Sequence, residues 1–394
     1  VLCSAPERRE ILMAIAITRR VGLFSVCVWA LLVLAGCQAG GGGASDQSAA
    51  HSAPVVEHGS TRGATVAMET AGGQREVTFL AQSLDEQFVT TLRETAPNVR
   101  LLVGLSDQEA LSMADEVHGI DGRYCSPEFL REATNLRWVQ ALSAGVDWYL
   151  RMPELRKNDE IVLTNMQAVH GPTIADHVFG MLLALTRDLR YYLNDAQRGT
   201  WNRSGSGAER IALRDRTMLV VGLGGIGREV AQRAKGFGMR VLATRRSDVP
   251  PPAFVDEQGT PDDLDAFLQE ADVVVLCVPL TDETRGMIGR DEFALMKEGT
   301  YLVNVARGAV VDTRALVQSL QRGHLAGACL DVTDPEPLPE DHVLWSMPNV
   351  VITPHVSSRS ALTEDRRWAL YVENVRRFGA GEPLLNVVDK AVGY

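Results

Sequence analysis

The stretch that decides the fold is Val220-Val221-Gly222-Leu223-Gly224-Gly225-Ile226-Gly227. An apolar run typical of a buried strand leads into glycines spaced G-x-G-x-x-G, and a helical pattern follows. Gly222 permits a tight turn, Gly224 lets the backbone approach a pyrophosphate, and Gly227 allows close packing of helix on strand. Free N–H groups at the helix start would face the phosphates. We therefore expect residues 222–227 to bind a dinucleotide. The alternative is a glycine turn that serves packing alone.

Apolar runs alternate with helical patterns on both sides of this stretch, which predicts an α/β fold built from parallel βαβ units. Six runs form the expected strands of one doubly wound sheet: 217–221, 240–243, 273–278, 301–305, 328–332 and 350–353. Four earlier strands are expected at 77–80, 99–103, 138–141 and 161–164. The expected helices are 85–95, 127–133, 171–189, 228–235, 313–321 and 361–378.

The end of the strand at 240–243 indicates which dinucleotide is bound. Enzymes that use NAD place an acid about 20 residues after the glycines, where it holds the ribose. Here the chain reads Leu242-Ala243-Thr244-Arg245-Arg246-Ser247, without a carboxylate. Arginine can hold a 2′-phosphate through two parallel hydrogen bonds, so Thr244, Arg245 and Arg246 favour NADP over NAD. The alternative is that both arginines are solvated and Asp248 binds the ribose.

Three further motifs each follow an apolar strand, and ligands of such sheets bind beyond the carboxyl ends of strands. They are Val303-Asn304-Val305-Ala306-Arg307-Gly308, Asp331-Val332-Thr333-Asp334-Pro335-Glu336-Pro337-Leu338 and Thr353-Pro354-His355. Arg307 can clamp an anionic substrate, His355 can shuttle a proton, and Glu336 can hold the imidazole and favour its protonated form. The alternatives are a structural ion pair for Arg307, a surface or structural role for His355, and a loop cap at Asp331.

Taken in order, these motifs resemble the D-isomer-specific 2-hydroxyacid dehydrogenase family, especially its NADP-using glyoxylate and hydroxypyruvate reductases. The resemblance covers about residues 77–394, and Ser143-Ala144-Gly145-Val146-Asp147 is similar to the family's loop that holds the substrate carboxylate. It implies three catalytic residues: Arg307, Glu336 and His355. It implies that Ala144, Gly145, Val146 and Arg307 bind substrate. Its implied cofactor contacts beyond the glycine loop and Thr244–Arg246 are Val278, Pro279, Val305, Asp331 and His355.

The family fold implies two domains, one of them split in the sequence. Residues 75–168 and 355–394 would form a smaller flavodoxin-like substrate-binding domain, and 169–354 a Rossmann domain that binds NAD(P). The long helix at 171–189 packs against a second subunit in this family, so the resemblance also implies a homodimer. His170 and His177 flank the start of that helix. We assign neither a catalytic role: His177 is expected to pack, and His170 to face the cleft.

The implied reaction is NAD(P)-dependent reduction of a small 2-oxoacid to a 2-hydroxyacid, or its reverse, with His355 as general acid and base. Relatives that act on formate pair their histidine with glutamine, so Glu336 argues against formate. One alternative is a non-catalytic dinucleotide-binding sensor of the same fold. Another is a dehydrogenase for phosphonate or phosphoglycerate. Turnover of an oxoacid would separate an enzyme from a sensor.

Composition excludes other classes of function. The 394 residues carry 39 Lys and Arg against 50 Asp and Glu, a net charge of −11, and no basic stripe, which argues against nucleic-acid binding. The six cysteines show no Cys-x-x-Cys pairing and no neighbouring histidine pairs. We therefore expect no metal site and no disulfide framework.

The first residues have the pattern of an export signal. Arg19 and Arg20 precede an apolar run at 21–35 that ends in Leu34-Ala35-Gly36-Cys37, similar to a bacterial lipobox. This predicts a signal peptide at 1–37 with lipidation of Cys37, a flexible Gly/Ser-rich linker at 38–74, and an exported lipoprotein anchored to a membrane. A plain cleaved signal, an uncleaved anchor and a twin-arginine signal are the alternatives. Met13 would make a more conventional start for such a signal, with residues 1–12 as upstream sequence. A misassigned N-terminus would favour the cytoplasm.

Overall fold

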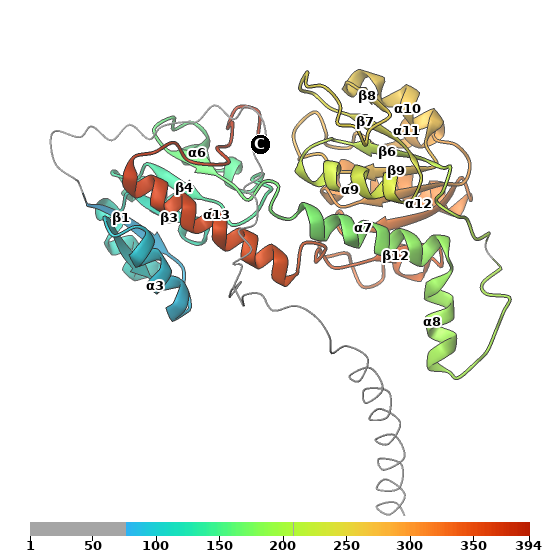
Figure 1. Ribbon diagram of the computed structural model, residues 1–394, viewed down its shortest axis with the longest axis horizontal. Helices are drawn as coiled ribbons and strands as arrows, with labels where there is room; N and C mark the ends of the chain where they lie inside the picture. Colours follow the sequence, from blue (N-terminus) through green and yellow to red (C-terminus); the bar gives the residue numbers. More distant parts are fainter. Residues whose placement is uncertain (1–75, 208) are drawn as a thin grey trace, which may run out of the picture. The chain divides into compact units, whose positions relative to one another are not determined.

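The computed structural model describes residues 76–207 and 209–394, which form two parallel sheets with flanking helices (Figure 1). This confirms the predicted α/β class with doubly wound parallel sheets. The predicted signal peptide, Cys37 and the linker lie outside the described residues. Within the described residues, no helix combines the length and the apolar character that a membrane span requires.

The first sheet has five strands in the order β2-β1-β3-β4-β5, all parallel. They are β1 (Val77–Ala81), β2 (Val99–Val103), β3 (Gly119–Asp121), β4 (Trp138–Gln140) and β5 (Val162–Thr164). This is the flavodoxin-like order. Helices cover both faces, which is why β1 is buried at every residue and apolar at all but one. Strand β3 was not predicted, because its three residues, Gly-Ile-Asp, form no apolar run.

The helices around this sheet are α3 (Glu86–Thr95), α4 (Asp107–Ser112), α5 (Pro127–Glu132), α6 (Pro153–Arg156) and α13 (Ala361–Ala380). All but α6 begin at a polar residue whose side chain caps a free N–H group. The side chains of Asp85, Ser126 and Ser360 each accept a hydrogen bond from the first turn of the helix that follows. Such a cap stabilises a helix by about 1 kcal/mol.

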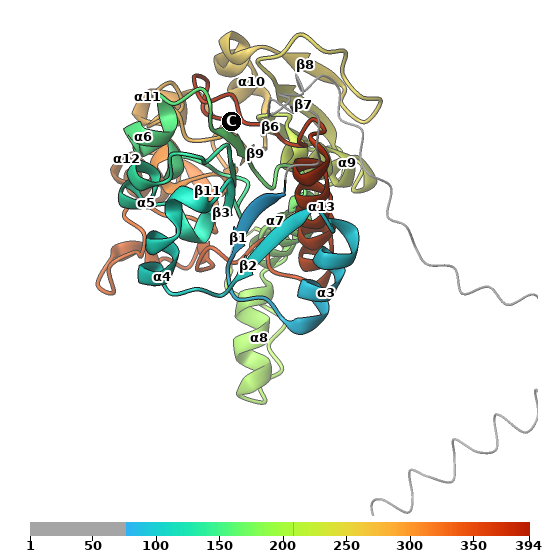
Figure 2. The same cartoon turned by 90° about the vertical axis from the view of Figure 1, so that its left-hand side faces the viewer.

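Helix α13 comes from the far end of the sequence and packs on the first sheet (Figures 1 and 2). Its buried residues include Tyr371 and Phe378. The Phe378 ring lies 5.0 Å from that of Trp138 on β4, which in turn lies 4.9 Å from Phe79 on β1. The core of the first sheet therefore depends on residues from both ends of the described chain.

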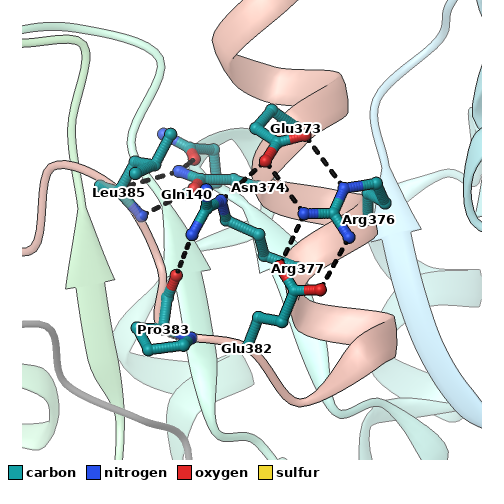
Figure 3. A network of polar contacts seen from close by, with 8 residues as sticks. All are labelled: Gln140, Glu373, Asn374, Arg376, Arg377, Glu382, Pro383 and Leu385. Atoms are coloured by element: carbon teal, nitrogen blue, oxygen red, sulfur yellow. Dashed lines mark hydrogen bonds and ion pairs between the residues drawn. The ribbon is translucent and has the colours of Figure 1, made fainter. Parts of the chain in front are cut away.

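Polar contacts also fix α13 to this sheet (Figure 3). The Asn374 side chain is fully buried; its amide donates to Gln140 Oε1 at 2.9 Å, and its oxygen accepts a backbone N–H from the chain after the helix. Arg376 pairs with both Glu373 and Glu382. Hydrogen bonding to Arg376 lowers the pKa of Glu373. Because both the nitrogen and the oxygen of the buried Asn374 amide are hydrogen-bonded, they specify one position of α13 relative to the strands.

The second sheet has seven parallel strands in the order β12-β11-β10-β9-β6-β7-β8. They are β6 (Thr217–Val221), β7 (Arg240–Thr244), β8 (Glu257–Gly259), β9 (Val273–Leu276), β10 (Thr300–Asn304), β11 (Leu325–Leu330) and β12 (Val350–Ile352). Strand order reverses between β6 and β9, and ligands of such sheets bind at that point. The prediction of six strands was wrong: β8 is an edge strand reading Glu-Gln-Gly, without an apolar signal.

The helices of the second sheet are α7 (Gly171–Thr186), α8 (Leu189–Gln197), α9 (Gly225–Gly236), α10 (Leu264–Glu270), α11 (Arg290–Leu295) and α12 (Thr313–Gln321). The prediction of one helix over 171–189 was wrong. Asp188 has φ +59°, which ends the helical path, and its carboxylate accepts the Ser206 N–H at 2.7 Å. Aspartate tolerates this left-handed conformation, and α8 then extends away from the sheet (Figures 1 and 2).

Short 3₁₀ helices complete the described structure. They are η1 (Ala114–Glu116), η2 (Gly122–Tyr124), η3 (Tyr149–Arg151), η4 (Pro261–Asp263), η5 (Gly308–Val310) and η6 (Val343–Ser346). Among them, η5 follows Arg307 directly and so shapes the loop that presents this residue.

Candidate active site

The glycine-rich loop joins β6 to α9 through two positions that require glycine. Gly222 has φ +98°, which strains any other residue. A Cβ on Gly227 would lie 2.1 Å from the Gly222 carbonyl oxygen. Helix α9 begins at Gly225, three residues earlier than predicted, and no side chain caps its first N–H groups. A Cβ built on Gly224 would meet no atom within 4 Å. Open space beside uncapped amides suits a phosphate group.

Three arginines lie at the carboxyl end of β7. Arg245 and Arg246 follow the strand, and Arg228 lies near the start of α9. Burial, together with the nearby charge of Arg228, lowers the pKa of Arg245, whose Nε donates to Ser247 Oγ at 2.6 Å. These three arginines form no ion pair among the described residues, although hydrogen bonds and, to a smaller degree, the charge of Arg246 lower the pKa of the exposed Glu283. A cluster of cations without a paired acid favours a bound anion.

The other residues predicted to bind the cofactor differ in how far their side chains are buried. Thr244 is buried, and its carbonyl oxygen accepts the N–H groups of Gly222 and Leu223 at 3.2 and 2.9 Å. Its main contact therefore holds the glycine loop. Val278 is half-buried after β9 and Pro279 is exposed, whereas Val305 is buried in the core after β10. Ile226 is half-buried and packs against that same core.

Arg307 lies against the loop that the sequence assigns to the substrate. Its Nε donates to Asp147 Oδ1 at 3.2 Å, and its Nη1 donates to the Ala306 carbonyl at 2.8 Å. A Cβ on Gly145 would lie only 1.6 Å from Arg307 Nη2, so the guanidinium rests on bare backbone. Arg307 thus forms an ion pair, as the structural alternative expected, but its partner Asp147 is part of the loop predicted to bind substrate. Arg307 is therefore beside the predicted carboxylate site.

The 143–147 loop has its carbonyl oxygens engaged and its amides free. Ser143 Oγ donates to the Gly145 carbonyl at 2.7 Å, and the Asn165 side chain donates to the Ala144 carbonyl at 2.9 Å. In the part of the chain that the structure describes, the N–H groups of Ala144, Gly145 and Val146 have no acceptor. Three free amides beside a guanidinium can bind a carboxylate.

A buried asparagine that the sequence analysis left without a role shapes the Arg307 loop. Asn304 is 1% exposed; its side-chain amide donates to the Arg307 carbonyl at 3.0 Å, and its oxygen accepts the Ala306 N–H at 3.0 Å. It lies at the end of β10 and closes the turn that follows. The Asn-x-x-Arg spacing in the quoted motif is the signal that could have revealed this.

Asp331 holds the segment that carries His355. The carboxylate is 2% exposed and accepts the Thr353 hydroxyl at 2.6 Å and the backbone N–H groups of Val356 and Ser357 at 3.0 and 3.1 Å. The pKa of Asp331 is lowered, because these hydrogen bonds outweigh its burial. Its carbonyl also accepts the His355 N–H at 2.8 Å. Asp331 therefore caps the loop, as the alternative expected, and the same hydrogen bonds position His355.

His177 is part of the same arrangement and was expected only to pack. Its Nε2 lies 2.9 Å from Thr353 Oγ1 and 3.8 Å from Asp331 Oδ1. Since the Thr353 hydroxyl gives its single hydrogen to Asp331, the His177 Nε2 must donate to that hydroxyl. His170 is 9% exposed, and burial together with the nearby charge of Arg367 lowers its pKa to about 4; its expected place along the cleft stays a prediction.

His355 and Glu336 contact each other directly. His355 Nδ1 lies 2.7 Å from Glu336 Oε1, and both side chains are a little under half exposed. Because a carboxylate accepts, Nδ1 carries the hydrogen, and Nε2 is left to face a substrate. His355 has φ +54°, an uncommon conformation for histidine. Such backbone values recur at functional sites.

The strands bring these groups to one edge of the sheet. Arg307 follows β10, Asp331 follows β11 and His355 follows β12, and these three parallel strands are neighbours. The glycine loop follows β6, two strands from β10 on the same edge. The Arg307 guanidinium, the His355–Glu336 pair and the glycine-rich loop therefore share one edge of the sheet, where ligands of such sheets bind. Within the described residues no group of acids, histidines and cysteines could hold a metal ion.

Comparison with known proteins gives the family. Residues 179–357 match the model described as "D-isomer specific 2-hydroxyacid dehydrogenase, NAD binding domain". A glyoxylate reductase of Korarchaeum cryptofilum is 38% identical over 271 residues, which cover 67% of this chain and 80% of the relative. The chain belongs to the D-isomer specific 2-hydroxyacid dehydrogenase family. It is therefore an NAD(P)-dependent oxidoreductase that acts on a CH–OH group.

Two further relatives support this. The glyoxylate/hydroxypyruvate reductase B of Pectobacterium carotovorum is 34% identical over 317 residues, 79% of this chain and 95% of the relative. The structure of a D-isomer specific 2-hydroxyacid dehydrogenase from Xanthobacter autotrophicus, in complex with NADPH and MES, superposes with a TM-score of 0.69. It is 29% identical and covers 81% of this chain and all of its own. The family resemblance predicted from the motifs is thus confirmed.

Proposed function

We propose that this protein reduces a small 2-oxoacid, of the glyoxylate or hydroxypyruvate class, with NADPH in preference to NADH. The contact that carries the proposal is His355 Nδ1 on Glu336 Oε1, which leaves Nε2 free at the edge of the sheet where Arg307 also lies. The names of the relatives from Korarchaeum cryptofilum and Pectobacterium carotovorum support the substrate class.

The chain's own residues would bind the substrate at its carboxylate. The free N–H groups of Ala144, Gly145 and Val146 would donate to the substrate carboxylate, and the Arg307 guanidinium would pair with it while polarising the keto oxygen. His355 donates a proton from Nε2 to that oxygen, and Glu336 stabilises the cationic ring before the transfer. When bound, the nicotinamide supplies the hydride. In the reverse direction neutral His355 accepts the proton.

Several features support NADPH as the preferred cofactor. The charge of Arg228 lies close to Arg245, and Arg246 follows directly in the sequence, so these guanidinium groups can bind the 2′-phosphate. An acid that would accept the ribose hydroxyls is missing from the end of β7. The Xanthobacter autotrophicus neighbour was solved with NADPH.

Absorbance at 340 nm tests the proposal directly. The full-length protein is mixed with NADPH or NADH and with glyoxylate, hydroxypyruvate, pyruvate or a larger oxoacid. We expect oxidation of NADPH that is fastest with the two smallest polar oxoacids. Tight NADPH binding without turnover of any oxoacid would instead support the dinucleotide sensor considered above.

Replacing Glu336 by glutamine should move the pH profile of reduction. Glutamine keeps the size and one acceptor of the side chain but removes the charge that stabilises protonated His355. We therefore expect the pH at which kcat for reduction falls by half to move down. Initial rates between pH 5 and 9 measure this. A profile that stays in place would show that Glu336 does not sustain the cationic ring.

We also propose that the protein is a homodimer joined through α8 and the segment after it. Leu193 is 64% exposed and Trp201 is 90% exposed, and apolar side chains this open usually mark a protein interface. We expect Leu193→Asp to halve the mass measured by analytical ultracentrifugation. Leu362→Asp, which changes an equally apolar residue that is 51% exposed on α13, is the control and should leave the mass unchanged.

The export signal remains a proposal, and we suggest that lipid-modified Cys37 anchors the protein to a membrane. Support comes from Leu34-Ala35-Gly36-Cys37 after an apolar run. Labelled palmitate should enter the wild-type protein and not Cys37→Ser, and wild type should sediment with membranes. Unlabelled protein in the soluble fraction would favour a cytoplasmic location.

A further inference from the structure

The last residues of the sequence form a closed turn. Asp389 N–H donates to the Tyr394 carbonyl at 3.1 Å, and Gly393 N–H donates to the Asp389 carbonyl at 2.8 Å. The Asp389 side chain accepts two more backbone N–H groups, from Ala391 and Val392, at 2.9 and 3.2 Å. These four bonds give residues 389–394 a defined shape without a helix or a strand. The Tyr394 side chain is therefore presented from a fixed backbone.

This turn is attached to the first sheet. The Lys390 ammonium donates to the carbonyl oxygens of Leu155 and Ile161 at 3.2 and 3.0 Å, and also to that of Asn158. These carbonyls surround the end of α6, so one cation satisfies three acceptors. Just before it, the buried Val388 donates its N–H to Leu163 on β5 at 2.8 Å. The turn therefore belongs to the flavodoxin-like part of the chain.

From this position Tyr394 reaches across to the cofactor-binding part. The Arg246 guanidinium carbon lies 4.7 Å from the centre of the Tyr394 ring, and one Arg246 nitrogen donates to the phenol oxygen. Arg246 is the second of the two residues after β7 that we assign to the 2′-phosphate. An aromatic ring attracts a guanidinium over its face and limits the orientations that this long side chain adopts.

We infer that Tyr394 is a positioning residue for cofactor choice: its ring fixes Arg246 so that the free edge of the guanidinium can bind the 2′-phosphate of NADP. The ring uses the flat face of the guanidinium and one of its five N–H groups, whereas a phosphate uses the edge. The remaining N–H groups stay available. This inference rests on the proposed preference for NADPH and adds the residue that orders one of its arginines.

Binding measurements on the full-length protein test the inference. Adenosine 2′,5′-bisphosphate and 5′-AMP are used as probes because they differ only in the 2′-phosphate, and NADPH and NADH are titrated alongside. We expect Tyr394→Ala to raise the Kd of the bisphosphate and of NADPH about 3- to 10-fold and to leave 5′-AMP and NADH unchanged. Tyr394→Phe keeps the ring and should retain most of the affinity. In turnover, KM for NADPH should rise while kcat stays constant.

The control is Val392→Ala, which changes an exposed residue of the same turn and should affect none of the four ligands. An equal loss for all four ligands with Tyr394→Ala would overturn the inference, because it would mean that the ring only supports the fold. Unchanged discrimination between the bisphosphate and 5′-AMP would overturn it as well. If wild type already binds these two probes equally, the proposed NADPH preference fails, which is a different result from failure of Tyr394 alone.

Discussion

Replacing His355 by asparagine is expected to lower kcat for oxoacid reduction by about 10²- to 10⁴-fold, the usual contribution of a positioned proton donor. The Glu336 contact occupies Nδ1 of His355 and leaves Nε2 of the same ring free at the sheet edge described above. Without it, the developing alkoxide would take its proton from water. The Kd for NADPH should change far less than kcat, since the phosphate-binding groups lie along other strands.

Asparagine is chosen over alanine because of the backbone. His355 has φ +54°, and asparagine adopts left-handed values more readily than most residues. The carbonyl and carboxylate of Asp331 hold this segment through backbone groups that the substitution leaves intact. Single-turnover absorbance at 340 nm measures the chemical step. A loss of less than about 10-fold would exclude His355 as the proton donor.

Gly145→Ala is expected to weaken substrate binding strongly while the fold survives. The new Cβ would lie 1.6 Å from Arg307 Nη2 and 2.7 Å from its Cζ, so the guanidinium must leave the loop. Since this is the far end of a flexible side chain, it moves at little cost to stability. KM for the oxoacid should rise by about 100-fold, because a charge-assisted pair contributes roughly 1.5–3 kcal/mol and the keto oxygen also loses its partner.

The matched control for this variant is Gly180→Ala in α7, where a Cβ would meet nothing within 4 Å. It adds the same methyl group to a helix and should leave KM unchanged. Thermal unfolding of both variants should match wild type within a few degrees. A KM for Gly145→Ala close to the wild-type value would mean that Arg307 does not act from the position seen here.

The sequence predicted the sheets well where strands are apolar and buried. Residues 217–221 coincide with β6, because parallel strands covered on both faces carry continuous apolar runs. Residues 99–103 coincide with β2, an edge strand that is only partly buried. The prediction failed at β3 and β8, which are three residues long and hold their place through neighbouring strands rather than through their own composition. It also failed at Asp188, where one left-handed residue divides a helix whose apolar pattern continues.

The candidate site could be predicted for residues whose chemistry shows in the side chain. The motifs that follow the strands contain Arg307, Glu336 and His355. In the structure Arg307 contacts the 143–147 loop, and His355 contacts Glu336. The supporting residues escaped notice because their role depends on contacts distant in sequence. His177 reaches Thr353 across 176 positions, and Arg307 meets Asp147 across 160. Asn304 acts locally but through backbone groups, which composition does not reveal.

The return of α13 to the first sheet has a consequence for biosynthesis. Residues 77–164 leave the ribosome before the seven-stranded sheet is made, yet Trp138 stays uncovered until Tyr371 and Phe378 have been made. The seven-stranded sheet draws its strands from one uninterrupted segment, 217–352, and can complete its core earlier. Of the two sheets, the one that is synthesised first is therefore the one that finishes folding last. During translation its aromatic surface is open to chaperones, and a nascent chain that stops before residue 361 would be a substrate for them and for proteases.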